Sequence, residues 1–303
     1  DVERFMQVDP QYRYVFLDNE PLDLVRYPNK NERTIILNSP EQLDDGYKVT
    51  VSKKHANRIA SWHSYDNVRA YGFLQWGWAS SYEKITDLSV DDRTFVMPGK
   101  CLFGVGDKKH IYILNAPEEL DYENEYYFSD DGILYIYAPE GLGNSTVFIP
   151  ALNADIINFP DTDNVTLNSI AVEGSMQTAV SGKGNNFTMT NCEISKSLHG
   201  IQIFKCHKMR INYNEIWGLA KHAIYSDGSG NEECKWTEGI VSEVCYNHIH
   251  DYGFAGNAYT IGACVCGSGL LVSHNEIHGC PTEAMAGGGY FNIYEYNDIY
   301  DIC

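Results

Sequence analysis

The chain has 303 residues, 41 of them acidic and 22 basic, which gives a formal net charge of −19 at pH 7. This negative charge opposes binding to nucleic acid, because the phosphates would be repelled. It fits a protein that binds neutral or cationic ligands, although a need for solubility explains it equally well. No apolar run approaches the 18 residues that a membrane-spanning helix requires, so we expect no transmembrane segment.

Residues 29–150 contain short alternating strands and no repeat. Turn signals such as Asp130-Asp131-Gly132 separate the strands, and many short strands at this spacing indicate an antiparallel β-sandwich-like domain. The clearest predicted strands are Thr34–Leu37, Tyr47–Val51, Ile111–Leu114 and Ile133–Tyr137.

Two tryptophans in this half, Trp76 and Trp78, stand two residues apart and would share one face of a strand. Such a face could stack on sugar rings. We favour burial in a core or between domains, because tryptophan buries a large area. The same interpretation applies to Trp62 and Trp217.

The second half repeats one short phrase six times. Each copy ends in an isoleucine, and the intervals between these isoleucines are 24, 22, 33, 28 and 22 residues: Ile170, Ile194, Ile216, Ile249, Ile277 and Ile299. A period of this length is typical of a solenoid. The apolar positions are mostly β-branched and alternate with period two, which favours strands over helices. Residues 151–303 are therefore predicted to form a parallel β-helix, with successive coils about 4.8 Å apart.

Two columns of the repeat are polar. The residue just before each isoleucine should face water. The residue two before it is asparagine in every copy but the second, where Cys192 interrupts the series: Asn168, Asn214, Asn247, Asn275 and Asn297. We predict that these asparagines stack as a structural ladder, since a buried amide without partners costs about 1–3 kcal/mol. The alternative is that asparagine merely tolerates a left-handed turn.

A further strand follows each phrase and carries Ile201, Ile224 and Met285. The two long intervals contain the polar, glycine-rich segments 226–233 and 253–258, which we expect to form loops. Insertions on one face of a repeat array often mark the binding face.

Nine cysteines leave at least one thiol unpaired within the chain. Cys280 and Cys303 fall at similar positions in successive coils, within disulfide reach. Free thiols stacked in the core are the alternative, and we favour it.

Several stretches resemble the right-handed β-helix carbohydrate-active proteins close to glycoside hydrolase family 141, in the pectate-lyase-like superfamily. They are Leu24–Asn29, Tyr71–Gly72–Phe73 running to Trp76–Gly77–Trp78, Leu114–Asp121 continuing through Glu125–Tyr127 to Gly132–Tyr137, and Ser273–His278. The resemblance implies an all-β fold, with residues 1–28 as the end of a first β-helix portion or a lead-in strand, an insertion over 29–150, and the main β-helix over 151–303. It also implies an extracellular or periplasmic enzyme that cleaves polysaccharides with carboxylates.

The family continues past the equivalent of residues 297–301 into further coils with an acidic Asp-Ala-Gly-Ala-type strand, and the resemblance implies that the catalytic acids lie there. The chain ends before that region, so no catalytic residue is carried over. We expect a truncated β-helix, with either a missing C-terminal remainder or end-to-end self-association covering its open end.

Substrate contacts are expected near the second strand. Three candidates stand two residues before its apolar positions, two should face outward by parity, and one follows the strand: His199, His222 and Glu283; Gln202 and Tyr225; and Asp227. His199 shares the parity of the inward Ile201, so a structural role at a corner is its alternative. Asp227 is equally suited to a turn. Asp251, which follows the phrase His248–Ile249–His250, is a further candidate.

Three functions remain open. The first is a glycoside hydrolase, whose two carboxyl groups would lie about 5–5.5 Å apart for retention or 6.5–9.5 Å apart for inversion. The second is a non-catalytic β-helix: an adhesin, a filament subunit or a glycan-binding structural protein. The third is a polysaccharide lyase that holds Ca²⁺ on carboxylate-rich loops. No tight acidic cluster supports Ca²⁺, and no other cofactor or metal is expected.

Overall fold

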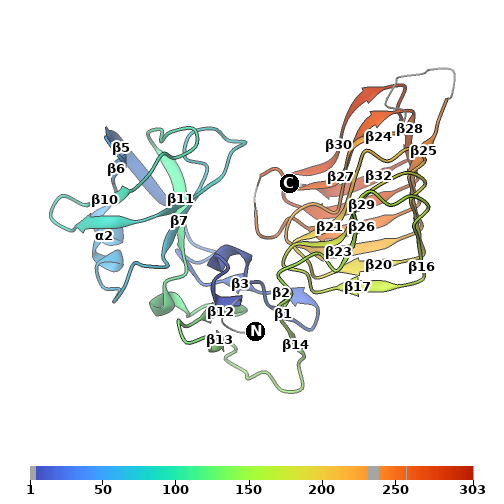
Figure 1. Cartoon of the computed structure of the whole chain (residues 1–303). Helices are drawn as coiled ribbons and strands as arrows, with labels where there is room; N and C mark the ends of the chain where they lie inside the picture. The colour runs from blue at the N-terminus through green and yellow to red at the C-terminus, as the bar shows by residue number, and fades with distance from the viewer. Residues whose placement is uncertain (1–4, 231–238, 257, 303) are drawn as a thin grey trace. The chain divides into compact units, whose positions relative to one another are not determined.

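A computed structural model describes residues 5–230, 239–256 and 258–302, and it divides the chain into two compact units. The β-helix unit comprises Asp1–Pro21 and Thr146–Cys303, and the inserted unit comprises Leu22–Ser145. The fold is nearly all β and contains a right-handed parallel β-helix, as predicted (Figure 1).

The β-helix has three parallel sheets of six strands, and each coil gives one strand to each sheet. Sheet 1 comprises β15 (Ile157–Phe159), β18 (Thr178–Lys183), β21 (His199–Phe204), β24 (Ile224–Gly230), β27 (Ile261–Ser268) and β30 (Glu283–Tyr290). Sheet 2 comprises β16 (Thr166–Asn168), β19 (Thr188–Thr190), β22 (Arg210–Asn212), β25 (Ser242–Cys245), β28 (Leu270–Ser273) and β31 (Ile293–Glu295). Sheet 3 comprises β17 (Ala171–Glu173), β20 (Glu193–Ser195), β23 (Glu215–Leu219), β26 (His248–Tyr252), β29 (Glu276–Cys280) and β32 (Asp298–Ile302).

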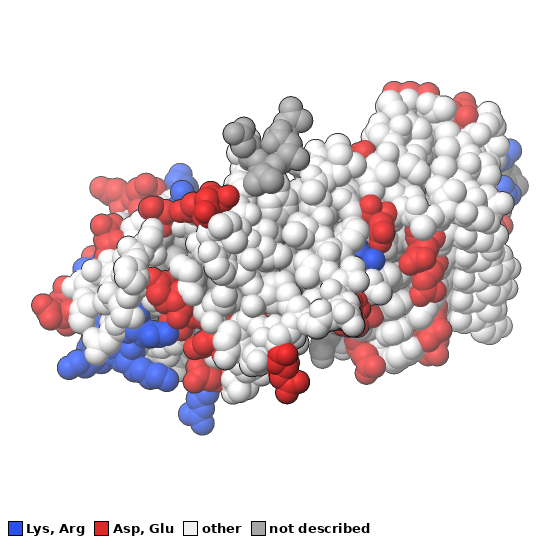
Figure 2. Space-filling model, turned by 90° about the horizontal axis from the view of Figure 1, so that it is seen from below, with Lys and Arg blue, Asp and Glu red and all other residues white. Residues whose placement is uncertain are grey.

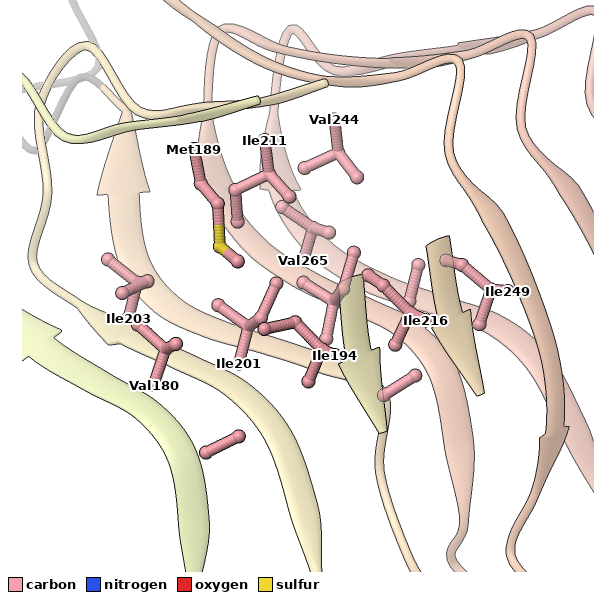
Figure 3. Close-up of a cluster of buried hydrophobic side chains, with 14 of the residues drawn as sticks. Val180, Met189, Ile194, Ile201, Ile203, Ile211, Ile216, Val244, Ile249 and Val265 are labelled. Carbon is pink, nitrogen blue, oxygen red and sulfur yellow. The ribbon is translucent and has the colours of Figure 1, made fainter. Parts of the chain in front are cut away.

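Apolar residues from all three sheets fill the interior of the β-helix (Figure 3). The repeat isoleucines Ile194, Ile216 and Ile249 are fully buried and belong to sheet 3. The apolar column five residues earlier supplies sheet 2, with Ile211 paired to Val244. The predicted inward positions are therefore confirmed for the four coils from Ile194 to Ile277, whereas Ile299 of the sixth coil keeps the register but is exposed.

The first coil departs from the predicted register. Val172, not Ile170, pairs with Ile194, so the first phrase is displaced by two residues. Ile170 is consequently exposed, and Asn168 pairs with Thr190 on sheet 2. The prediction that Asn168 joins the ladder is wrong. The recurring Asn-x-Ile motif therefore does not give the register of the first coil, which the observed strand pairing shows to be shifted by two residues.

The other four asparagines form the predicted ladder. Asn214 Nδ2 donates to Asn247 Oδ1 and Asn247 Nδ2 donates to Asn275 Oδ1, each at 2.9 Å, and Asn275 continues to Asn297 in the same way. Each amide also binds backbone: Asn247 Nδ2 donates to Ile211 O at 2.8 Å. Asn214, Asn247 and Asn275 are buried, so the ladder satisfies groups that water cannot reach.

The alternative interpretation of these asparagines, as left-handed turn residues, is wrong. The positive φ falls one residue earlier, at Tyr213, Tyr246, His274 and Tyr296. The first two coils have Ser169 and Asn191 at this place. Ring stacking accompanies the turn, since the Tyr213 and Tyr246 rings are parallel with centroids 4.9 Å apart.

The predicted loop 226–233 is partly strand. Residues up to Gly230 belong to β24, whose backbone pairs with β27 through Ser229 and Gly267. Asp227 lies on this strand opposite Phe204, and not in a loop. Residues 231–233, together with Asn257 of the second predicted loop, lie outside the described residues.

A short antiparallel sheet of the β-helix unit joins β1 (Phe16–Leu17) to β2 (Glu20–Pro21) and β14 (Val147–Phe148). The 3₁₀ turn η1 (Pro10–Tyr12) precedes it. Phe16 packs with Tyr14 and Leu198 in a small apolar cluster.

The inserted unit is built mainly of antiparallel strands. Its larger sheet has the order β8-β7-β11-β5-β6-β10-β9, with β4 also paired to β11. The strands are β4 (Arg26–Tyr27), β5 (Ile35–Leu43), β6 (Gly46–Thr50), β7 (Arg69–Gly72), β8 (Ser81–Lys84), β9 (Thr86–Ser89), β10 (Thr94–Met97) and β11 (Lys109–Leu114). A smaller sheet joins β3 (Asp23–Leu24), β12 (Glu125–Phe128) and β13 (Leu134–Ile136), and η2 (Pro117–Glu119) precedes β12.

One helix of the inserted unit was not predicted. Helix α2 (Lys53–Ile59) begins after Ser52, whose side chain accepts a hydrogen bond from His55 N. It buries only Ala56 and Ile59, too few positions to give a helical stripe in the sequence.

The tryptophans divide between two environments. Trp62 is buried and donates to Glu119, as expected for a core residue. Trp76 and Trp78 lie in a turn, about half exposed, with nearly parallel rings 6.5 Å apart. Their assignment to a strand and to buried packing is wrong.

The face of the molecule in Figure 2 shows more acidic than basic side chains, in line with the net charge of −19.

Candidate functional site

The predicted substrate residues lie on sheet 1, but they do not form one cluster. His199 and His222 stack with ring centroids 5.2 Å apart. Register then places Ile261 next in the same column and Glu283 one coil beyond it. Glu283 is thus two coils from His222, and the predicted three-residue column is interrupted by an apolar residue.

His199 and His222 are adapted to being neutral. Burial is the main cause that lowers the pKa of His199 to about 3, with the His222 and Lys221 charges adding to it. Burial likewise lowers the pKa of His222 to about 4. His222 Nδ1 accepts from Ile261 N at 3.2 Å, whereas His199 Nδ1 has no partner among the described residues. This favours the structural alternative for both histidines.

Gln202 and Tyr225 face outward on neighbouring strands, as parity predicts, and pair directly in the register. Gln202 Oε1 accepts a hydrogen bond from Thr178 at 3.3 Å. The Tyr225 ring lies 6.0 Å from that of Phe204, which is 38% exposed. These residues give sheet 1 a surface with both polar and aromatic groups.

Sheet 3 carries a denser group of acidic, histidine and aromatic side chains, which the sequence analysis did not identify as a site. Two outward columns flank the buried isoleucines and run across five neighbouring strands. They are Glu193, Glu215, His248, Glu276 and Asp298 in one column, and Trp217, His250, His278 and Tyr300 in the other, which begins at the buried Ser195.

Close contacts link the two columns. His248 Nδ1 and His250 Nε2 lie 2.9 and 2.8 Å from the same Oε1 atom of Glu215. His248 Nε2 lies 2.9 Å from His278 Nε2. Two overlapping groups, Glu215–His248–His250 and His248–Glu276–His278, each place three ligand atoms within 4.8 Å of one another. Nitrogen and oxygen donors at this spacing suit a transition-metal ion.

The end of this face holds an ionised carboxylate. Tyr300 donates to Glu276 Oε1 at 2.7 Å. That hydrogen bond is the main cause that lowers the pKa of Glu276, and the nearby histidines add to it. The same bond raises the pKa of Tyr300 to about 12.

A signal for this face was present in the sequence. The column before each isoleucine was predicted to face water, and it does in the coils that keep register. The residues two positions further along must share that face, because strand side chains alternate. Trp217 accordingly lies on the outer surface, where its Nε1 donates to Glu193 at 3.0 Å, and not in the core as expected.

Most of the described cysteines are buried. Cys192, Cys245, Cys264 and Cys280 are buried, free thiols. Cys303, the proposed partner of Cys280, lies outside the described residues.

The match to a family model agrees with this architecture. Residues 143–299, more than half of the chain, match the family model described as "Right handed beta helix region". A solved structure titled "Glycoside hydrolase" is 12% identical, with a TM-score of 0.45, and the match covers 94% of this chain and 77% of that one. No curated protein matches. No described helix is long and apolar enough to cross a membrane. The chain belongs to the right-handed β-helix family.

Proposed function

We propose that this chain is a carbohydrate-active protein that hydrolyses glycosidic bonds of a polysaccharide on the outer face of sheet 3. The observation that carries the proposal is the stacking of Glu276 and Asp298 in direct register. Neighbouring strands lie about 4.8 Å apart, close to the 5–5.5 Å between the carboxyl groups of retaining glycosidases.

The Tyr300 hydroxyl that binds Glu276 supports an assignment of the two roles. Glu276 is held ionised by the Tyr300 hydroxyl and is suited to attack the anomeric carbon. Asp298 would give its proton to the leaving oxygen, and later take one from the water that cleaves the glycosyl ester. The other stacked pair is less suited, because Glu193 is bound by Trp217 and Glu215 by two histidines.

Reducing-sugar release from a panel of polysaccharides tests this proposal. Glu276→Gln and Asp298→Asn should each lower the rate by about 10²–10⁴-fold, because each removes acid–base or nucleophilic chemistry. Glu193→Gln lies in the same column and should retain activity. Equal rates in all three variants, or no release from any substrate, would refute hydrolysis at this pair.

A second candidate is glycan binding without catalysis on sheet 1. Gln202 and Tyr225, with Phe204 beside them, give polar and aromatic contacts on adjacent coils. Asp227 and Glu283 are exposed nearby on the same sheet, on different coils. We propose these residues as the binding surface in this case, with His199 and His222 supporting its edge.

Affinity electrophoresis in polysaccharide gels separates the two candidates. Tyr225→Ala should lose retardation if sheet 1 binds, and Thr188→Ala, an outward residue of sheet 2, should not. Retention that depends on Tyr225 but not on Glu276 would favour the non-catalytic function. Either function has a polymeric glycan as ligand, which supports an extracellular or periplasmic location.

A further inference from the structure

We propose that the outer face of sheet 3 binds one divalent transition-metal ion of the zinc class through Glu215, His248 and His250. The backbone sets the three positions. His248 and His250 are two residues apart on β26 and so share a face. Glu215 pairs directly with His248 from the neighbouring strand β23.

The ligand atoms already converge. Glu215 Oε1 is 2.9 Å from His248 Nδ1 and 2.8 Å from His250 Nε2. Two donors at 2.0–2.1 Å from a tetrahedral zinc ion are about 3.3 Å apart. Small side-chain rotations would therefore admit the ion without a change in the strands.

Both histidines have an outer partner that fixes the ring. His250 Nδ1 lies 2.7 Å from Asp251 Oδ2, and His248 Nε2 lies 2.9 Å from His278 Nε2. Metal-bound histidines regularly donate their second ring N–H to a carboxylate such as that of Asp251, which orients the ring and leaves the other nitrogen for the metal. The His278 ring would orient His248 in the same way. Asp251 and His278 therefore act as positioning residues.

The two carboxylates that face His250 would also favour a cation at this place. Its two ring nitrogens face two carboxylates, those of Asp251 and Glu215. Ionised carboxylates only accept, and a neutral imidazole has one N–H to give. In the tautomer that gives this N–H to Asp251, Nε2 is the ligand atom, and a metal ion could bind both Nε2 and Glu215 Oε1.

Donor chemistry and exposure define the class of ion. Two nitrogens and one carboxylate suit Zn²⁺ and its neighbours, whereas Ca²⁺ and Mg²⁺ take oxygen ligands. The three side chains are 18–44% exposed, which leaves a fourth position for water or a ligand oxygen. The overlapping group around His278 is less suited, because Tyr300 already binds Glu276.

Equilibrium dialysis of the untagged chain against Zn²⁺, and titration with Co²⁺ followed by its visible absorption, test the site. We expect one tightly bound Zn²⁺ and a Co²⁺ spectrum of four- or five-coordination. His248→Gln and His250→Gln should abolish both signals. Asp251→Asn, which tolerates the same left-handed backbone, should weaken zinc about 10–100-fold.

His274→Gln is the matched control, since His274 is exposed on the neighbouring coil and outside both groups of ligands. Circular dichroism establishes that each variant is folded. Zinc affinity that is equal in the control and in His250→Gln, or a wild-type chain without zinc at stoichiometric concentration, would overturn the proposal. So would a zinc site abolished by His278→Gln but untouched by Glu215→Gln, because the ion would then lie in the other group.

The metal proposal stands apart from glycoside hydrolysis. Glu276→Gln and Asp298→Asn should keep zinc binding while losing hydrolysis. A chain that binds zinc and cleaves no glycan supports the site and not the proposed reaction, and the reverse result does the opposite.

Discussion

Asn247 shows how much one side chain of the ladder holds together. Its Oδ1 accepts from both Asn214 N and Asn214 Nδ2, and its Nδ2 donates to Ile211 O and Asn275 Oδ1. Truncation in Asn247→Ala would leave several buried polar groups without partners. We expect the free energy of unfolding to fall by about 2–4 kcal/mol, measured from the denaturant midpoint.

Asn168→Ala is the control for this change, because Asn168 is exposed and outside the ladder. Its effect should stay within about 0.5 kcal/mol. A loss of stability as large as that of Asn247→Ala would show that Asn168 belongs to the ladder after all.

The stacked histidines His199 and His222 predict acid sensitivity. An unfolded histidine takes up a proton near pH 6.5, whereas burial keeps these two neutral to about pH 3 and about pH 4. The unfolded state thus binds more protons within this window. Their stabilisation is complete above pH 6.5 and is lost as the pH falls toward 4.

Replacing one histidine tests this linkage. In His199→Gln, the slope of unfolding free energy against pH between 4 and 6.5 should drop by up to about one proton. His274→Gln changes an exposed ring and should leave the slope as in the wild type. Identical slopes in wild type and His199→Gln would contradict a neutral, buried His199.

At the scale of the strand, the repeat predicted the coil and the ladder because both depend on periodicity. Alternation identified the inward isoleucines, and a fixed interval identified Asn214, Asn247 and Asn275. Register failed at the first coil, where the phrase recurs but Val172 occupies the inward place. A recurring sequence motif cannot reveal a two-residue shift in strand register, because such a shift leaves the same side chains facing inward and outward.

The candidate site on sheet 3 could be found from the sequence only by predicting which strands pair. His248 and His250 were visible as neighbours, but their contact with Glu215 needs the pairing of β23 with β26 across a 33-residue interval. Hydrogen bonds such as His250 to Asp251 depend on side-chain rotamers, which periodicity does not determine. The exposed turn at Trp76 and Trp78 was missed because aromatic residues there resemble a buried strand.

Replacing Cys192 tests whether the asparagine ladder can extend into the second coil. It occupies the asparagine position of its coil, and its backbone N donates to Asn214 Oδ1 at 3.0 Å. In Cys192→Asn the new amide could donate to Asn214 and to the preceding strand, as the other members do. We expect a gain of about 0.5–1.5 kcal/mol in unfolding free energy.

Cys192→Ser is the reference for this variant, since a hydroxyl supplies one donor and cannot span both partners. Denaturant midpoints of the two variants give the comparison. A serine variant as stable as the asparagine variant would show that the ladder does not extend into this coil.

For the whole molecule, the two ends of the inserted unit leave the β-helix unit from one small sheet. Strand β1 lies between β2 and β14, with Leu17 paired to Val147, and Asp18 exchanges hydrogen bonds with Thr146. Two strands on either side of a third are about 10 Å apart. A linker of about five residues, which reaches up to about 17 Å, could therefore replace residues 22–145.

We expect the chain with this linker to fold, because the inserted unit and the β-helix have separate buried cores. It should unfold cooperatively, bind Zn²⁺ as the full chain does, and retain polysaccharide binding if the glycan lies on sheet 1 or sheet 3. Circular dichroism melts, zinc dialysis and gel retardation measure the three properties. Loss of retardation with the other two intact would instead assign glycan binding to the inserted unit, where the exposed Trp76 and Trp78 rings lie parallel. An excised chain without cooperative unfolding would show that the β-helix depends on residues 22–145 for its stability.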